Sequence, residues 1–228
     1  MTRSHLLPGT RVQRLRSSHS YGVVLALVVV TFVFIELAGD DAWTTSALLL
    51  LESATLVIAL WTSGLARTNS PVSVGLLVGS VVTAVAVMIW SGDALQGTVA
   101  LLSAALTVGI VVVVALGVFD QGEINGQSVI GAITIYVQLG FIFLFIYGGI
   151  AAFGHTPLFA QGTDGTRAIR LYFSYITLAT VGYGDYTPGT PVARVAAVVE
   201  ALSGQLYLVT VIAVLVSRMR PKRRTETD

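Results

Sequence analysis

Six long apolar runs constrain this chain more than any other feature. Each run contains 18 or more residues, and about 20 apolar residues cross the hydrocarbon core of a bilayer as a helix. The runs cover residues 21–38, 45–62, 72–90, 98–119, 129–153 and 192–217. Only 11% of the 228 residues are charged, whereas a soluble domain carries about a quarter. The sequence therefore predicts an all-α membrane protein with six transmembrane helices.

The basic residues predict the orientation of these helices. Four arginines precede the first run, Arg67 lies between the second and third runs, and five basic residues follow the sixth. By the positive-inside rule these segments are cytoplasmic, and an even number of spans places both termini on that side. We expect a multi-pass protein of the plasma (cell) membrane. A cleaved signal peptide in place of the first span is the alternative, and it would leave five spans with the later topology unchanged.

The division into segments follows from the loops. We expect a cytoplasmic segment at 1–20, a four-helix module at 21–119, a linker at 120–128, a second module at 129–217 and a basic tail at 218–228. The tail can contact anionic lipid headgroups. The net charge of +1 gives no indication of a nucleic-acid partner. There is no cysteine, which excludes disulfides and thiolate metal sites.

The second module contains a non-apolar insert between its two spans. Thr166 can cap a short helix at residues 167–179, which is too short to cross a bilayer. Irregular backbone at membrane depth is tolerated only where it is buried in protein or lines a water-filled cavity. A span, a short re-entrant helix, an irregular strand and a span together indicate a pore.

The irregular strand contains "TVGYG" at residues 180–184. Alternating right- and left-handed conformations turn successive carbonyls to one side, and only glycine enters the left-handed region at little cost. Gly182 and Gly184 stand at alternate positions, so Val181 and Tyr183 would turn their side chains toward the short helix. A row of carbonyl oxygens suits a weakly hydrated monovalent cation, and the negative end of the short helix favours a cation too.

With its neighbours, this stretch resembles the signature sequence of the potassium channel family, in which TVGYG is the selectivity filter. In "TLATVGYGD", Thr177 and Thr180 have the family spacing and Asp185 follows directly. The resemblance covers residues 129–217, whereas the first four runs match six-span channels only in number. It implies a pore helix and filter between the fifth and sixth spans. It also implies a homotetramer, with four filters around one axis.

The resemblance implies roles for individual residues. The backbone carbonyls that would coordinate K⁺ are those of Thr180, Val181, Gly182 and Tyr183. The Thr180 hydroxyl would form the innermost site, and the Gly184 carbonyl would face the outer mouth. We expect no cofactor other than K⁺ ions in the filter.

Three residues around the filter would support it. Thr177 belongs to the signature, and Asp185 would sit behind the filter. Tyr172 occupies the place of the short-helix donor that usually holds this aspartate. Some bacterial relatives pair the aspartate with a Glu, whose place here is Ile176, so that carboxylate pair is absent.

Other residues of the second module admit two interpretations. Gly204 lies 20 residues after Gly184, matching the family's gating hinge, and close packing against a neighbouring helix is the alternative. Leu208 and Ile212 follow at helical spacing, and they either line an inner cavity or pack. In the third run, Gly75 and Gly79 form a G-x-x-x-G pattern that indicates close helix packing.

Two acids lie inside apolar runs, where an unpartnered carboxylate costs several kcal/mol. Glu200 either ties the sixth span to the short helix or fifth span by a hydrogen bond, or takes part in gating or proton sensing. For Glu52 a structural role and a functional role are equally open.

The function expected is a potassium-selective channel that conducts passively. The alternative is a regulatory subunit that joins other channel subunits without conducting alone. An intramembrane protease needs a Ser–His pair, and the three histidines lie outside the runs, so we do not expect an enzyme. The fourth run has no charged residue, and therefore no arginine ladder. We expect gating that is weakly dependent on voltage or independent of it.

Overall fold

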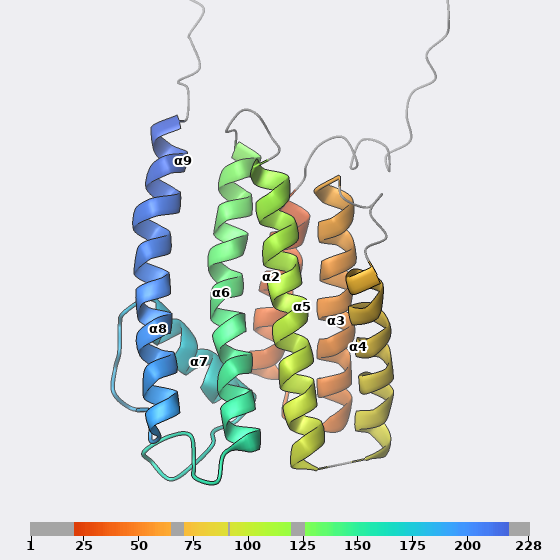
Figure 1. Ribbon diagram of the computed structural model, residues 1–228, viewed down its shortest axis with the longest axis vertical. Helices are drawn as coiled ribbons and strands as arrows, with labels where there is room; N and C mark the ends of the chain where they lie inside the picture. Colours follow the sequence, from red (N-terminus) through yellow and green to blue (C-terminus); the bar gives the residue numbers. More distant parts are fainter. Residues whose placement is uncertain (1–20, 65–70, 91, 120–125, 219–228) are drawn as a thin grey trace, which may run out of the picture.

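The computed structural model describes residues 21–64, 71–90, 92–119 and 126–218, and this part of the chain is almost entirely helical. The helices, in chain order, are α2 (Tyr21–Leu37), α3 (Ala42–Thr62), α4 (Pro71–Ile89), α5 (Asp93–Phe119), α6 (Gly126–Phe153), α7 (Arg167–Leu178), α8 (Pro191–Tyr207), the π-helical turn η2 (Leu208–Ile212) and α9 (Ala213–Arg218). Figure 1 shows the long helices side by side, with the short α7 between α6 and α8 near one end. The predicted all-α class is therefore confirmed.

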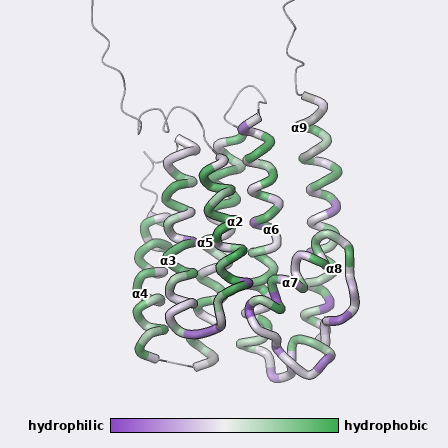
Figure 2. Tube along the Cα trace, turned by 180° about the vertical axis from the view of Figure 1, so that it is seen from behind, coloured by the Kyte–Doolittle hydropathy of each residue, from purple (hydrophilic) through white to green (hydrophobic). Residues whose placement is uncertain are grey.

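Within the described residues, five helices are long and apolar enough to cross a membrane, judged by length and composition. They are α3, α4, α5, α6 and the run that begins with α8. The first predicted span, α2, is apolar but has only 17 residues, or about 25 Å of helix. Figure 2 shows hydrophobic residues dominating the helices and many hydrophilic ones in the segments that join α6, α7 and α8.

Tryptophans stand near both ends of α3. Trp43 and Trp61 are exposed by 58% and 60% of their surface, and 18 positions separate them. That is about 27 Å along a helix, close to the hydrocarbon thickness of about 30 Å. Tryptophan is enriched at both membrane interfaces.

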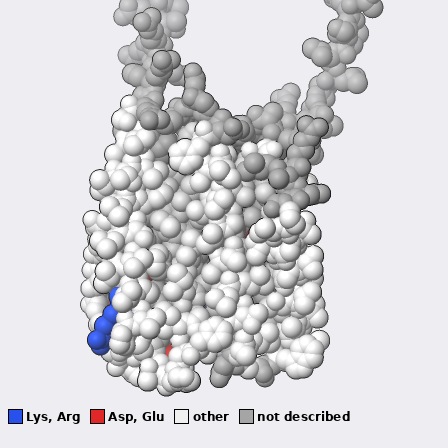
Figure 3. Space-filling model, in the orientation of Figure 1, with Lys and Arg blue, Asp and Glu red and all other residues white. Residues whose placement is uncertain are grey.

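The face in Figure 3 is nearly free of charged side chains apart from a basic patch near the lower end.

Three predicted helix starts are wrong by several residues. α3 begins at Ala42 rather than at 45, α5 begins at Asp93 rather than at 98, and α6 begins at Gly126 rather than at 129. Hydropathy misses these first turns because most of their residues are polar or small, although their backbone is helical. Gln127 also has a partner in the first helix, since its Oε1 accepts the backbone N–H of Tyr21 at 3.0 Å. The predicted linker at 120–128 therefore loses residues 126–128 to α6.

The last predicted span is interrupted by the π-helical turn η2. The Thr210 hydroxyl donates to the Leu206 carbonyl four residues earlier. A hydroxyl that bonds back in this way competes with the helical backbone and often bends a helix. The apolar pattern of the run contains no signal for this change.

Three apolar clusters hold the helices together. The first joins α2, α3, α4 and α5 around Leu56 and Leu106. The second connects α2, α3 and α5 to α6 and α7 through Phe141 and Leu171. The third packs α6, α7 and α8 around Phe173. The short helix α7 is thus fixed from two sides, by the first four helices and by α8.

The packing predicted for Gly75 and Gly79 is wrong within this chain. A methyl group added at Gly75 would meet no atom within 4 Å, and one at Gly79 would meet only the Leu102 side chain at 3.8 Å. Close approach occurs instead at Gly140, where an added Cβ would lie 2.6 Å from the Tyr175 ring. The G-x-x-x-G pattern lies on a helix that is mostly exposed.

Candidate functional site

The short helix α7 begins and ends close to the predicted positions. The Thr166 side chain accepts a hydrogen bond from the Ile169 backbone N–H at 3.2 Å, which confirms the predicted cap. Helix α7 has 12 residues, or about 18 Å, and cannot cross a bilayer alone. The chain then runs without helix from Ala179 to Thr190, where the Thr190 hydroxyl caps α8 by accepting from the Ala193 N–H.

The backbone after α7 alternates in handedness. Thr180, Gly182 and Gly184 have φ values of +57°, +52° and +79°, while Val181 and Tyr183 between them do not. The amides of Val181 and Gly182 both donate to the Ile176 carbonyl, at 2.8 and 3.1 Å. Such alternation lets successive carbonyls point to one side of a strand.

The left-handed conformation of Thr180 was not expected from the glycine pattern. Thr180 is the only residue other than glycine with positive φ among the described residues. A β-branched residue in this region is a strained outlier, and such strain gathers at functional sites. The signal available in the sequence was the position of Thr180, two residues before Gly182 in the same alternation.

The structure brings the predicted support residues together around the predicted filter, residues 180–184, which is called the filter stretch below. The rings of Tyr172 and Tyr183 stack with centroids 6.5 Å apart and planes within 5°. Loss of hydration, and then hydrogen bonding to the Asp185 carboxylate, raise the pKa of Tyr172. Tyr183 nevertheless stays 72% exposed and Val181 51% exposed in the single chain. Thr177 lies in the last turn of α7, and the Thr180 N–H donates to its carbonyl at 2.9 Å.

A residue that sequence reasoning missed holds the far end of this stretch. Gln161 donates through Nε2 to the Asp185 carbonyl at 2.8 Å, and its Oε1 accepts the Thr187 N–H at 3.3 Å. Phe159 also pairs with Pro188 in an antiparallel bridge. Nothing in the sequence around Gln161 distinguishes it from other loop amides.

Glu200 is fully buried and joins three helices. The Tyr147 hydroxyl of α6 donates to its Oε2 at 2.6 Å, and the Ser174 hydroxyl of α7 contacts its Oε1. Ser174 also contacts the Gly140 carbonyl of α6 at 2.8 Å. This geometry supports the interpretation of Glu200 as a hydrogen-bonded tie between helices, since its carboxyl connects α8 to both α7 and α6. Tyr147 and Ser174 were not singled out from the sequence, because their pairing with Glu200 spans 53 and 26 residues.

Gly204 lies against the end of α7. A methyl group added there would collide with the Leu178 carbonyl oxygen, so the site requires glycine for packing. The next residue, Gln205, donates through Nε2 to the Thr180 hydroxyl at 3.3 Å, and it was not predicted. Leu208 starts the π-helical turn and is 44% exposed. The side chain of Ile212 lies outside the described part of the structure. The hinge and cavity roles stay predictions.

Glu52 is not brought to this site. It is buried in α3 beside a cavity of about 10 Å³ lined also by Thr31, Thr55 and Gln138. This volume is about what one water molecule needs. Its Oε2 has no hydrogen-bond partner among the described residues.

Comparisons with known proteins address the same part of the chain. Residues 131–220 match a family model described as "Ion channel". The chain is 25% identical over 111 residues to the mouse (Mus musculus) protein named potassium voltage-gated channel subfamily A member 10, a match that covers 46% of this chain and 21% of that protein. It is 29% identical over 82 residues to the putative potassium channel protein YugO of Bacillus subtilis, covering 36% of this chain and 24% of that protein. The matches thus span less than a quarter of each relative. No solved structure matches the chain.

Proposed function

The chain belongs to the potassium channel family, and from this premise we propose that it forms a K⁺-selective pore that conducts passively across the cell membrane. One observation carries the proposal most strongly. Thr180, Gly182 and Gly184 alternate in handedness with the residues between them, directly after a short helix that cannot span. Aligned carbonyl oxygens replace the hydration shell of a K⁺ ion in filters of this kind.

In this proposal the ion sites are formed by backbone oxygens. The carbonyls of Thr180, Val181, Gly182 and Tyr183 coordinate K⁺. The Thr180 hydroxyl completes the innermost site, and the Gly184 carbonyl faces the outer mouth. The stack of Tyr172 on Tyr183 supports this assignment, because it holds the Tyr183 side chain against α7.

A homotetramer is part of the proposal. Every residue from Ala179 to Asp185 is exposed in the single chain. Irregular backbone at membrane depth must be covered by protein or line a water-filled cavity. Four copies around one axis meet both conditions, since the carbonyls then line the pore and the side chains face neighbouring copies.

We also propose that the pore depends only weakly on voltage. Helix α5 occupies the position of a voltage-sensing fourth span, yet residues 94–119 contain no charged side chain. Moving one charge through the field supplies about 2.3 kcal/mol per 100 mV, so steep gating requires several charges in each subunit. In this proposal helices α2 to α5 brace the pore, and both termini are cytoplasmic.

Purified protein in liposomes tests the proposal. Currents or fluxes are measured under a K⁺/Na⁺ gradient, and the reversal potential should lie close to the K⁺ equilibrium value. Equal permeation of both ions contradicts the filter assignment. A protein that folds but carries no current alone supports the alternative, a subunit that conducts only together with other channel subunits.

A further inference from the structure

Glu52 lies in the middle of α3 and takes no part in the contacts around the filter stretch. Its side chain is only 4% exposed, and its Oε2 has no hydrogen-bond partner among the described residues. Nearby in α5, the Ser103 hydroxyl is fully buried and also lacks a partner within that part of the chain. Burial of a carboxylate without a partner is strongly unfavourable. The environment of Glu52 therefore has to supply a compensating interaction.

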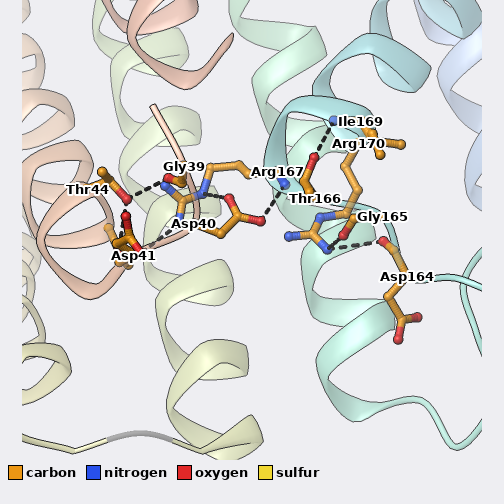
Figure 4. Close-up of polar contacts among 11 residues, drawn as sticks. Gly39, Asp40, Asp41, Thr44, Asp164, Gly165, Thr166, Arg167, Ile169 and Arg170 are labelled. Carbon is orange, nitrogen blue, oxygen red and sulfur yellow. Dashed lines mark hydrogen bonds and ion pairs between the residues drawn. The ribbon is translucent and has the colours of Figure 1, made fainter. Parts of the chain in front are cut away.

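The surrounding helices contain no basic side chain that could neutralise Glu52. Helices α2 to α6 have no Lys, Arg or His. Arg167, at the start of α7, is engaged elsewhere (Figure 4). Its Nε lies 3.9 Å from a carboxylate oxygen of Asp40, and its Nη2 donates to the Thr45 hydroxyl at 2.6 Å. In the part of the chain that the structure describes, no ion pair includes Glu52, so its counter-charge must come from outside the chain.

The Glu52 side chain lines a cavity of about 10 Å³ where α2, α3, α5 and α6 meet. Thr31 of α2, Thr55 of α3 and Gln138 of α6 contribute further polar side chains to its wall. Both threonine hydroxyls donate to carbonyls four residues earlier in their own helices, at 2.9 and 2.8 Å. Since each hydroxyl proton is already used, the two oxygens offer only lone pairs to a partner in the cavity.

Oxygen acceptors around so small a space suit a small cation. Carboxylate, hydroxyl and amide oxygens are hard ligands, and hard ligands prefer hard cations. The volume is about that of one water molecule, so the cavity admits a single dehydrated ion. One carboxylate balances one positive charge, whereas a divalent cation would leave an unpaired charge in the membrane interior. These limits select a monovalent ion, and the small volume favours Na⁺ over the larger K⁺.

We propose that this cavity binds one Na⁺ ion, held by the Glu52 carboxylate, the hydroxyl oxygens of Thr31 and Thr55 and the amide oxygen of Gln138. The ion neutralises the buried acid and connects α2 and α3 to α6. Beside Gln138, the Val137 carbonyl accepts the Tyr175 hydroxyl of α7 at 2.6 Å.

The Na⁺ site thus lies next to a contact that holds the short helix. The proposal goes beyond K⁺ conduction and does not depend on it, because every ligand lies outside the filter stretch.

Binding of radiolabelled Na⁺ to the purified protein tests this. All samples contain excess K⁺, so that K⁺ occupies the proposed filter. We expect saturable binding in the wild type and an affinity at least about tenfold weaker in Glu52→Gln, the effect of losing a charged ligand. The matched control is Glu36→Gln, which removes an exposed carboxylate of α2 outside the cavity. This control should change the Na⁺ affinity less than about twofold.

Two outcomes overturn the proposal. Equal Na⁺ affinity in the wild type and Glu52→Gln places the bound ion elsewhere. A wild type that binds no Na⁺, and whose Tm is unchanged when N-methyl-D-glucamine replaces Na⁺ at constant K⁺, has its buried acid neutralised by a proton.

A second variant keeps the test decisive if Glu52→Gln does not fold. Thr55→Val removes one proposed ligand while it retains the carboxylate and a side chain of similar shape. We expect its Na⁺ affinity to fall by about threefold or more, the effect of losing one neutral polar contact. An unchanged Na⁺ affinity in Thr55→Val also contradicts the proposed site.

Discussion

Helices α4 and α8 lie at opposite edges of the molecule, and both are largely exposed along their length (Figure 1). Their surroundings differ. The polar links of α4 are with α3: the hydroxyls of Ser80 and Ser53 lie 2.6 Å apart, and the Ser46 hydroxyl donates to the Ala84 carbonyl at 2.8 Å. Helix α8 lies beside the filter stretch, contains buried Glu200 and reaches Thr180 through Gln205. Exposure alone therefore does not separate a lipid-facing helix from a subunit-facing one, whereas polar ties to a functional segment do. We expect lipid on α4 and other copies of the chain on α8.

The largest expected contrast is between two glycines, Gly182 in the filter stretch and Gly75 in α4. An added methyl group meets nothing within 4 Å at either position, but only Gly182 has positive φ, +52°. A side chain in that conformation costs about 1–2 kcal/mol per copy. We expect Gly182→Ala to reduce K⁺ flux into liposomes by more than about tenfold. Gly75→Ala should leave the flux unchanged. Equal fluxes in both variants contradict the role of backbone handedness.

The next contrast compares buried polar ties. Glu200→Ala leaves the Tyr147 and Ser174 hydroxyls without their shared partner. We expect it to lower the free energy of unfolding by about 1–3 kcal/mol, because the buried Tyr147 hydroxyl is left unsatisfied, whereas Ser174 keeps its contact with the Gly140 carbonyl. Ser80→Ala in α4 should cost only about 1 kcal/mol. Thermal unfolding in detergent measures both.

A third variant, Glu200→Gln, separates the two interpretations of Glu200. Its amide keeps one acceptor and gains donors, so the proposed tetramer should persist with little loss of stability. An altered response of channel opening to pH in this variant supports proton sensing. A response equal to the wild type leaves only the role of a tie between helices.

A smaller effect is expected from glycine-to-alanine changes within the helices. Gly204→Ala forces a methyl group against the Leu178 carbonyl, and overpacking of this kind costs about 1–3 kcal/mol. Gly79→Ala in α4 meets only a side chain at 3.8 Å and should stabilise by up to about 1 kcal/mol through helix propensity. The difference in Tm between the variants is the measurement. A change in Tm of the same sign in both variants contradicts the distinction between the two helices.

The smallest expected effect concerns voltage. Conductance–voltage curves in symmetric K⁺ should correspond to fewer than about four gating charges per tetramer. The reason is the uncharged stretch of α5. A steeper curve means that charge moves in some other segment, and the assignment of α2 to α5 as a brace is then wrong.

The sequence predicted the features that depend on local chemistry. The length of the apolar runs located the long helices, and Thr166 located the start of α7. The spacing of Gly182 and Gly184 located two of the three residues with positive φ in the filter stretch. Helix ends such as Asp93 and Gly126 were missed because hydropathy does not register polar helical turns. The irregular turn at Leu208 was missed because apolar patterns are alike in α- and π-helical backbone.

The partners within the site could not be predicted. Tyr147 with Glu200 and Gln161 with Asp185 are pairings across many residues. Such pairings depend on how helices pack, and a single sequence does not contain that information. The role of Gly204 illustrates the limit, since its offset from Gly184 matched a hinge, whereas the contact with Leu178 became visible only in three dimensions.

The Arg167 backbone N–H donates to the Asp40 carboxylate at 2.9 Å (Figure 4), and this contact has a consequence for the order of synthesis. The two residues are 127 positions apart, so at about 5–20 residues per second the ribosome makes the second roughly 6–25 s after the first. The turn between α2 and α3 therefore exists long before α7 does, and it presents a carboxylate at the place where α7 begins. The carboxylate that contacts the start of α7 is thus synthesised before α7 itself.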